Sequence, residues 1–231
     1  MEHVTNNSNV AVFITALNEE EGIGPTIEEM RRSLNDPFFL VVDGNSVDKT
    51  PEIAGHAGAK VVVQDGKGKG QAICQGLENL PPNTKYVVFT DADFTYPAKH
   101  IPKMIEILDE NPRVGMVVGN RFNRDITFKE ASNDIFLFGN RLLAFAQHLV
   151  NGIKLQDPLT GLRVVRSEIL KGWIPKSKGF DIEAEMNYIV ERKKYQIVEI
   201  PIGYRPRLGE KKLKLRHGLI ILNRILIESM T

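Results

Sequence analysis

Residues 87–97 read VVFTDADFTYP, an apolar run typical of a buried strand that ends in two aspartates, Asp91 and Asp93, around Ala92. Buried carboxylates are costly unless a positive charge pairs with them. Because the two positions are two residues apart, both side chains are expected on the same side of an extended chain. Such a pair suits a hard divalent cation, which takes oxygen ligands and keeps waters and substrate phosphates. The alternative interpretation is a turn after the strand, with Asp93 capping the next helix.

Apolar runs of strand length occur on both sides of this stretch, and helical patterns separate them. Strands are predicted at 10–16, 38–43, 59–64, 85–91 and 114–119, and helices at 25–34, 46–55, 70–79, 97–110 and 132–151. Near-continuous Val and Ile runs indicate strands that are covered on both faces. The alternation predicts a single α/β domain, with a mostly parallel sheet and helices on both sides.

Polar residues follow these predicted strands where each strand ends. They are Asn18 and Glu19, Asp43, the loop 66–70, Asp91 and Asp93, and Arg121. Ligands of such sheets bind outside the carboxyl ends of the strands, so these side chains are expected to share one rim. For Asp43 two roles fit: it accepts hydrogen bonds from a nucleotide base or ribose, or it forms a turn with Asn45 or Ser46.

The loop DGKGKGQA, residues 65–72, is rich in glycine and opens onto a predicted helix. Its backbone can approach phosphates closely, and Lys67 and Lys69 add positive charge. The loop lacks both the Walker A pattern and the usual dinucleotide fingerprint. The alternative interpretation is a flexible surface loop.

After residue 120 the pattern changes. A turn leading to a short strand is predicted at 157–166, a helix at 181–194 and a strand at 196–204. Glu183 and Glu185 lie two apart on that helix, so they point in different directions and one of them can face the site. A basic cluster that can neutralise a diphosphate or a phosphate acceptor consists of Arg121, Arg205, Arg207, Lys211 and Lys212. For each of these cations alone, a solvated surface charge is the alternative.

Composition excludes several classes of protein. The 231 residues carry a formal net charge of +1, which argues against a nucleic-acid partner. A single cysteine rules out a disulfide framework within one chain and fits a cytoplasmic location. No window of about 18 apolar residues predicts a transmembrane helix. The tail, residues 213–231, predicts an amphipathic helix that lies on the cytoplasmic face of a membrane or packs on the domain or in a homodimer.

A series of motifs along the chain resembles the family 2 glycosyltransferases, and more closely the dolichyl-phosphate (polyprenyl-phosphate) sugar synthases. In order they are TALNEEEGI, VVDGNSVDKT, GKGKGQA, FTDADFTYP, GNRF, QDPLTGLR and YRPRLGEKKLKL, from about residue 10 to 215. The resemblance implies a GT-A fold over 10–212, after a disordered N-terminus at 1–9. It also implies a nucleotide-diphosphate sugar donor, Mg²⁺ or Mn²⁺, and inversion at the sugar carbon.

The resemblance also assigns roles by position. Nucleotide-sugar binding falls to Ala16, Leu17, Asn18, Glu19, Asp43, Lys69, Gly70, Asp91, Ala92 and Asp93. The implied metal ligands are Asp93 and Asp91, and the implied phosphate-binding residues are Arg121, Arg207 and Lys212. Asp157 matches the acidic residue of the acceptor-side loop, and with Asp91, Asp93 and Arg121 it completes the implied catalytic set.

The chain departs from the family pattern at three places. The second motif reads Asp43-Gly44-Asn45-Ser46 where the family often has Asp-Asp-Gly-Ser. Thr95 stands where a Gln is common, and Lys211 stands where a Ser often precedes the last basic residue.

The expected reaction is sugar transfer from GDP-mannose, UDP-glucose or UDP-N-acetylglucosamine to dolichyl or polyprenyl phosphate. A lipid phosphate is already an anionic nucleophile, whereas a sugar hydroxyl needs a general base, for which Asp157 is the candidate. The alternatives are a glycosyltransferase acting on a sugar hydroxyl and a nucleotidyltransferase. The acidic segment LNEEEG after the first strand is unsuited to a triphosphate and disfavours the second. A non-catalytic membrane-associated binding module predicts loss of the rim acids, which are present.

Overall fold

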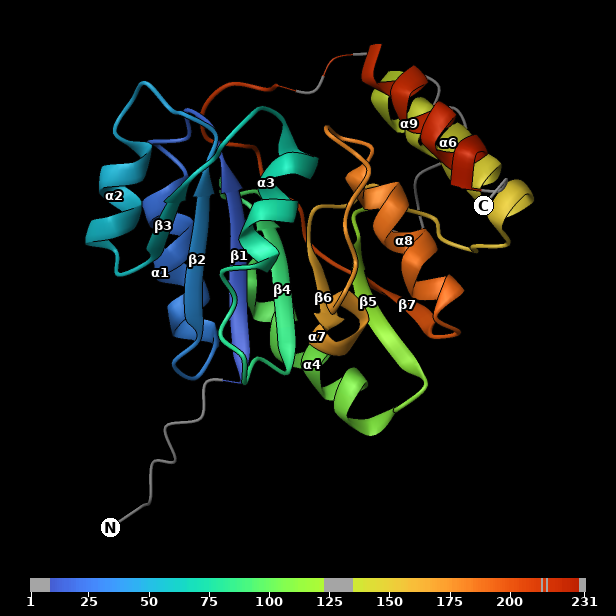
Figure 1. The fold of residues 1–231 in the computed structure, drawn as a ribbon, viewed down its shortest axis with the longest axis horizontal. Coiled ribbons are helices and arrows are strands. Elements are labelled where there is room, and N and C mark those ends of the chain that lie inside the picture. The colour runs from blue at the N-terminus through green and yellow to red at the C-terminus, as the bar shows by residue number, and fades with distance from the viewer. Residues whose placement is uncertain (1–8, 123–134, 213, 215, 229–231) are drawn as a thin grey trace.

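The computed structural model describes residues 9–122, 135–212, 214 and 216–228 (Figure 1). Its centre is a seven-stranded sheet in the order β3-β2-β1-β4-β6-β5-β7. The strands are β1 (Val10–Ala16), β2 (Phe38–Asp43), β3 (Lys60–Val63), β4 (Tyr86–Asp91), β5 (Val114–Asn120), β6 (Arg163–Arg166) and β7 (Gln196–Pro201). Every strand pair is parallel except the two that β6 makes. The predicted α/β class with a mostly parallel sheet is therefore confirmed.

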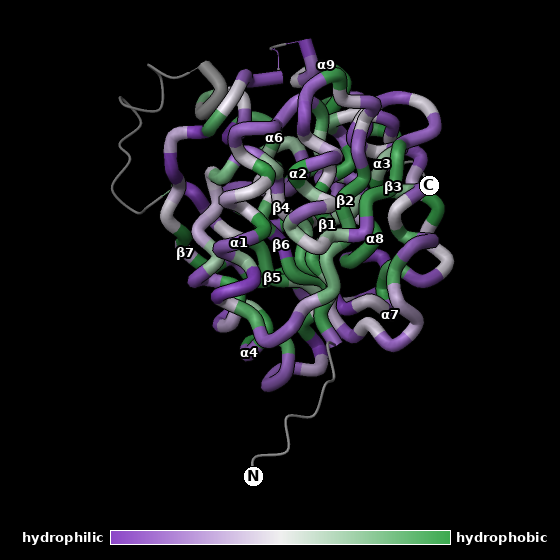
Figure 2. The backbone as a smooth tube through the Cα atoms, turned by 90° about the vertical axis from the view of Figure 1, so that its left-hand side faces the viewer, coloured by the Kyte–Doolittle hydropathy of each residue, from purple (hydrophilic) through white to green (hydrophobic). Residues whose placement is uncertain are grey.

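Helices cover both faces of this sheet. They are α1 (Ile23–Ser33), α2 (Thr50–His56), α3 (Lys69–Leu77), η1 (Ala98–His100), α4 (Ile101–Glu110), α6 (Ile135–Asn151), α7 (Ser167–Leu170), α8 (Ile182–Arg192) and α9 (Arg216–Glu228). Along β1, Val12 and Ile14 pack into the core shared with α1 and α4, whereas Phe13 packs into the core shared with α3 and α8. Each such buried side chain contributes about 1.5–3 kcal/mol. Figure 2 shows this concentration of hydrophobic residues along the strands.

Several predicted bounds were wrong. α2 begins at Thr50 rather than Ser46, β7 ends at Pro201 rather than residue 204, and the short helix α7 was not predicted. Asn9 belongs to the ordered part, because its carbonyl accepts hydrogen bonds from the N–H groups of Lys85 and Tyr86. The rest of the predicted disordered N-terminus and residues 132–134 lie outside the described residues.

The chain's last described helix, α9, packs beside α6 and against α8 (Figure 1). Leu143 of α6, Ala184 of α8, and Ile221 and Ile225 of α9 form a third apolar cluster. The helix predicted in the tail is thus present from Arg216 to Glu228. None of the helices in the described part of the chain is long and apolar enough to span a bilayer.

The register of the sheet aligns the strand ends that carry the polar residues. Ala16 pairs with Asp43 across β1 and β2, and Thr15 pairs with Asp91 across β1 and β4. β6 runs the other way because the turn before it already lies at this edge, where Leu162 O accepts a hydrogen bond from Gly119 N. The ends of β1, β2, β4 and β5 therefore meet at one rim, as predicted for parallel strands.

Candidate active site

The ends of β1 and β2 are joined by a network of turn hydrogen bonds. Asn18, with φ of 48°, donates its N–H to Ser46 Oγ at 2.8 Å and accepts from Val47 N at 2.8 Å through Oδ1. Asp43 is buried and accepts hydrogen bonds from Ser46 N at 2.9 Å and from Ser46 Oγ at 2.6 Å. Asp43 therefore forms the turn that the sequence offered as one of its two roles, and its role toward a nucleotide stays a prediction.

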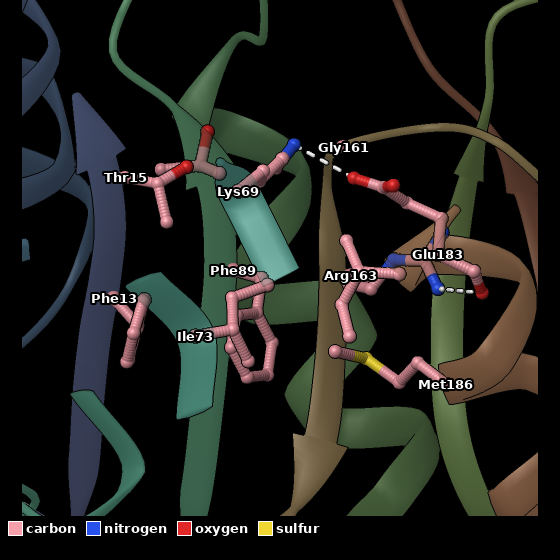
Figure 3. A pocket seen from close by; sticks show the side chains of 11 residues that line it. Phe13, Thr15, Lys69, Ile73, Phe89, Gly161, Arg163, Glu183 and Met186 are labelled. Carbon is pink, nitrogen blue, oxygen red and sulfur yellow. Dashed lines mark hydrogen bonds and ion pairs between the residues drawn. The ribbon is translucent and has the colours of Figure 1, made fainter. Parts of the chain in front are cut away.

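Asp91 is neutralised by a side chain of the protein itself. Lys69 Nζ lies 2.7 Å from Asp91 Oδ1 and 2.7 Å from Glu183 Oε1, and Figure 3 shows the Lys69–Glu183 pair. Gly161 packs on the same carboxylate, because a Cβ there would lie 2.4 Å from Asp91 Oδ2. Burial alone would raise the pKa of Asp91, but the charges of Lys69, Arg121 and Arg207 together outweigh it and hold that pKa below its ordinary value. Asp91 is thus an ionised acid with an internal partner.

Asp93 lies in a different environment. Its Oδ1 accepts hydrogen bonds from Thr95 Oγ1 at 2.7 Å and from Thr95 N at 3.2 Å. Its Oδ2 lies 3.6 Å from Arg207 Nη1, which is longer than a hydrogen bond. Burial, together with the nearby charge of Asp91, raises the pKa of Asp93. The site therefore contains one carboxylate, Asp93, whose charge is incompletely compensated.

The two acids do not act as a matched pair with common partners, as their spacing suggested. β4 ends at Asp91, and the chain turns at Phe94, which has φ of 62°. Among the described residues no three His, Cys, Asp or Glu side chains are grouped to hold a metal. Asp93 Oδ2 nevertheless fits a cation that takes one or two carboxylates and completes its shell with waters and phosphates. Thr95, at the position where the family commonly has Gln, orients Asp93.

The basic segment before α9, residues 205–212, runs beside residues 93–95. Leu208 N donates to Asp93 O at 3.0 Å, which places Arg207 over the rim. Arg207 Nη2 lies 2.8 Å from Glu19 Oε1, and Lys212 Nζ lies 2.5 Å from the same oxygen. Burial raises the pKa of Glu19, and its pairing with Lys212 and Arg207 only partly offsets this. The structure therefore brings together three predicted site residues from opposite ends of the chain.

Arg205 does not belong to this basic group. Its Nη2 lies 2.5 Å from Glu29 Oε2, and its guanidinium stacks 3.9 Å from the centre of the Phe94 ring. Its backbone N–H donates to Thr95 O. Arg205 thus anchors the segment to α1, and the prediction that it faces a phosphate is not supported.

Asp157 is fully buried and holds Arg121 in a forked ion pair. Arg121 donates to it through Nε and Nη2, both at 2.7 Å, and through its backbone N–H at 3.0 Å. Asn140 Nδ2 donates to Asp157 Oδ1 at 3.2 Å. A carboxylate has about four acceptor positions, and these four donors occupy them. Asp157 therefore positions Arg121, and its use as a general base for a hydroxyl acceptor stays a prediction.

The turn before β6 is fixed from inside by Arg163. This buried guanidinium donates to Pro158 O, Thr160 O, Glu183 O and Asn187 Oδ1. It is the large side chain labelled beside Glu183 in Figure 3. Arg163 is thus a structural residue.

The glycine-rich loop is packed tightly and does not form an open cradle. Gly68 has φ of 93°, and a Cβ on it would lie 2.1 Å from Lys178 O. A Cβ on Gly70 would lie 2.0 Å from Ser177 O, and Gly70 N donates to Lys178 O at 3.2 Å. The glycines therefore admit the 177–179 backbone at the start of α3. The N–H of Gly70 is thus used within the protein, and its predicted role in nucleotide-sugar binding stays a prediction, whereas Lys69 lies in the site.

This packing predicts the effect of a methyl group in the loop. Gly70→Ala is expected to destabilise the protein by about 1–3 kcal/mol, because the neighbouring backbone cannot easily yield. The melting temperature should fall by about 2–4 °C for each kcal/mol. Gly55→Ala in α2 is the matched control, since nothing lies within 4 Å of its Cβ position. An unchanged melting temperature with lost nucleotide affinity would instead support a phosphate cradle.

Glu183 is the main site residue to which the sequence assigned no definite role. It faces Lys69 from the first turn of α8, whereas Glu185 accepts hydrogen bonds from the backbone of Lys176 and Ser177 and from Trp173 Nε1. The spacing of the two glutamates indicated that only one faces the site, but not which one. The identity of its partner depends on packing between α3 and α8.

Comparison with known proteins supports the family resemblance that the sequence motifs indicated. Residues 11–173 match the family model described as "Glycosyl transferase family 2". A dolichyl-phosphate hexose transferase of Haloferax volcanii is 32% identical over 205 residues, which cover 89% of this chain and 86% of that protein. Glycosyltransferase AglJ of the same organism is 35% identical over 201 residues, 86% of this chain and 63% of AglJ.

Some relatives are much longer than this chain. A dolichol-phosphate mannosyltransferase of Pyrococcus furiosus is 28% identical over 220 residues, which cover 89% of this chain and 59% of that protein. The chain likewise spans 50% of the hexosyltransferase Agl6 of Haloferax volcanii.

The fold also matches solved structures. Glucosyl-3-phosphoglycerate synthase from Mycobacterium tuberculosis in complex with UDP superposes with a TM-score of 0.75 at 22% identity, over 96% of this chain and 80% of that one. A structure of the same enzyme with Mn²⁺, UDP-glucose and phosphoglyceric acid gives a TM-score of 0.74 at 22% identity, over 96% and 79%. At this identity the likeness establishes the fold, which is GT-A. The family model matches residues 11–173, which is most of the chain, and the hexose transferase of Haloferax volcanii is 32% identical to the chain. The chain therefore belongs to glycosyltransferase family 2 and is a glycosyltransferase.

Proposed function

We propose that the protein transfers a sugar from a nucleotide-diphosphate sugar to a dolichyl or polyprenyl phosphate, with inversion. The bond from the anomeric carbon to the nucleoside diphosphate breaks, and a bond from that carbon to a lipid phosphate oxygen forms. The observation that carries the proposal is the saturated carboxylate of Asp157, which Arg121 and Asn140 occupy completely. Among the described residues the acceptor side thus offers a cation and no free base, which suits an anionic nucleophile better than a hydroxyl.

Relatives support the choice of acceptor. Two of the aligned relatives are named for dolichyl or dolichol phosphate, one a hexose transferase and the other a mannosyltransferase. Arg121 is the cation proposed to meet the lipid phosphate, because Asp157 leaves it partly exposed at the rim. Its guanidinium also lies 5.4 Å from the centre of the Tyr204 ring, which limits its movement.

Asp93 is the residue proposed to hold a divalent cation, Mg²⁺ or Mn²⁺. Its Oδ2 lacks a short hydrogen bond, and its raised pKa indicates a charge that the protein leaves incompletely compensated. Such a cation, when bound, stabilises the negative charge of the departing nucleoside diphosphate. Structures of the mycobacterial synthase with this fold contain Mn²⁺ or Mg²⁺ together with UDP. Asp91 already pairs with Lys69. We propose that it does not coordinate the cation directly and instead adds negative charge next to Asp93.

The remaining cations are proposed to bind the donor. Arg207 and Lys212 now pair with Glu19, and a diphosphate offers them more acceptor oxygens than one carboxylate. The rim formed by residues 16–19 and Asp43 is proposed to hold the base and ribose. GDP-mannose, UDP-glucose and UDP-N-acetylglucosamine are the proposed donors.

A thermal-shift panel tests donor binding. A ligand that binds only the native protein at a hundred times its Kd stabilises it by about 2.7 kcal/mol, or about 5–10 °C for a domain of this size. One nucleotide sugar with Mn²⁺ is expected to give such a shift in the wild type and in Glu106→Gln, an exposed control on α4. The shift should disappear in Asp93→Asn. Absence of a shift with every GDP- and UDP-sugar would overturn the donor proposal.

A further inference from the structure

α6 exposes a continuous apolar stripe. Its large exposed side chains have relative exposures from 47% to 73% and are Phe138, Leu142, Phe145 and Leu149. Spacings of four, three and four residues place them on one side of the helix. The opposite side of α6 is buried, with Leu143 and Gln147 packed toward α8.

α9 exposes a second stripe of the same kind. Its side chains are 40% to 74% exposed and are Leu219, Ile220, Leu226 and Ile227. The other side of α9 buries Ile221, Ile225 and Glu228. α9 therefore packs on the domain through one side only, and further apolar side chains remain exposed on its other side. Packing on the domain, one of the two interpretations of the tail, accounts for only part of this helix.

The two stripes lie on neighbouring helices. α6 and α9 run side by side at the edge of the molecule (Figure 1), and Asn151 Nδ2 donates to Ile225 O at 3.3 Å. Both helices direct their buried sides toward each other and toward α8, so the stripes lie on the outer side of the pair. We call these eight exposed side chains the α6–α9 face. Apolar side chains exposed singly are ordinary, whereas a contiguous group of this kind marks an interaction surface.

The charges around the α6–α9 face identify its partner. α6 contains no acidic residue, and the one acid of α9, Glu228, is buried beside Arg224. Arg141 of α6 and Lys214 and Arg216 at the start of α9 supply positive charge. Within the described residues of these two helices, the apolar side chains are flanked by cations and by no exposed carboxylate, which fits the interface of an anionic bilayer. Against a second copy, the same arrangement would bring cations toward cations.

We propose that the α6–α9 face docks on an anionic lipid surface, with both helices lying in the plane of the membrane. Asn140, which lies on α6 between Phe138 and Arg141, donates to Asp157, which holds Arg121. Docking would therefore bring the Arg121 side of the rim close to the headgroups. The link to a lipid acceptor rests on the proposed function, whereas the docking itself does not.

Vesicle flotation tests the docking. The wild type is expected to float with vesicles of phosphatidylcholine and phosphatidylglycerol and to bind less to phosphatidylcholine alone. The double variant Phe145→Glu/Leu149→Glu should lose at least about tenfold in affinity, because two carboxylates replace buried apolar area. Ile174→Glu is the matched control, since Ile174 is 77% exposed but lies in the loop between α7 and α8.

Three results would overturn the proposal. They are no flotation of the wild type, an equal loss in Ile174→Glu, and a concentration-dependent dimer that the double variant dissolves. Transfer to a short-chain, water-soluble polyprenyl phosphate separates this proposal from the proposed function. The double variant should keep that activity and its melting temperature. A wild type that floats but transfers no sugar would refute the function and leave the docking intact.

Discussion

Asp93→Asn is expected to lower kcat/KM by about 10³-fold and, at neutral pH, to make the ligand-free protein more stable. Activity falls because the amide removes the charge proposed to hold the divalent cation. Stability rises because burial and the charge of Asp91 make the ionised Asp93 unfavourable in the folded protein. The amide oxygen can still accept both hydrogen bonds from Thr95, so the local structure should persist.

The pH dependence of this effect has a definite sign. The folded-state pKa of Asp93 lies above the unfolded value near 3.8. Protonated Asp93 therefore contributes fully to the free energy of unfolding only below that unfolded pKa. The contribution is lost as pH rises through the folded pKa. The difference in melting temperature between Asp93→Asn and the wild type should therefore shrink as pH approaches the unfolded value.

Asp91→Asn is the matched counterpart with the opposite sign. The folded-state pKa of Asp91 is lowered, since the charges of Lys69, Arg121 and Arg207 together outweigh the effect of burial. Its contribution to stability is present above the unfolded pKa and is lost as pH falls through the folded pKa. At pH 7, Asp91→Asn should thus melt below the wild type. Two variants that shift the melting temperature in the same direction would contradict the assigned roles.

Asp157→Asn is expected to give the largest loss of stability, about 3–5 kcal/mol, because it leaves the largely buried guanidinium of Arg121 without its counter-charge. At about 2–4 °C for each kcal/mol, the melting temperature should fall by roughly 6–20 °C. The double variant Arg121→Met/Asp157→Leu should recover part of this loss, because it removes both charges. Thermal unfolding of the three proteins measures the effect.

The same variant separates positioning from general-base catalysis. If Asp157 positions Arg121, Asp157→Asn should raise KM for the acceptor and leave the shape of the pH–rate profile unchanged. If Asp157 were the base, the limb of the profile that reports the base would disappear.

The parallel strands could be predicted because their burial is local in the sequence. Runs such as FFLVVD and YVVFTD are apolar on both faces, which only a covered sheet accommodates. The antiparallel direction of β6 could not be predicted, since it depends on where the turn at 157–162 meets β5. α7 has only four residues and carries no periodic signal.

The site could be located from the sequence, but its pairings could not. Strand ends predicted that Asp43, Asp91 and Arg121 share a rim. The partner of Asp91 is Lys69, in a loop expected to bind phosphate, and Glu183 joins them only because α8 packs beside α3. The partners of Asp157 could not be predicted either. Three of its four hydrogen-bond donors come from Arg121, which is 36 residues away in the sequence, and the fourth is Asn140.

Product analysis with two acceptors tests the proposed reaction most directly. The protein is incubated with Mn²⁺, with the nucleotide sugar that raises its melting temperature, and with either a polyprenyl phosphate or the corresponding polyprenol. Mass spectrometry and NMR then identify the product and its anomeric configuration. We expect a sugar joined to the lipid phosphate with inverted configuration, and no transfer to the polyprenol. Transfer to a hydroxyl but not to the phosphate, or retention at the anomeric carbon, would contradict the proposed function.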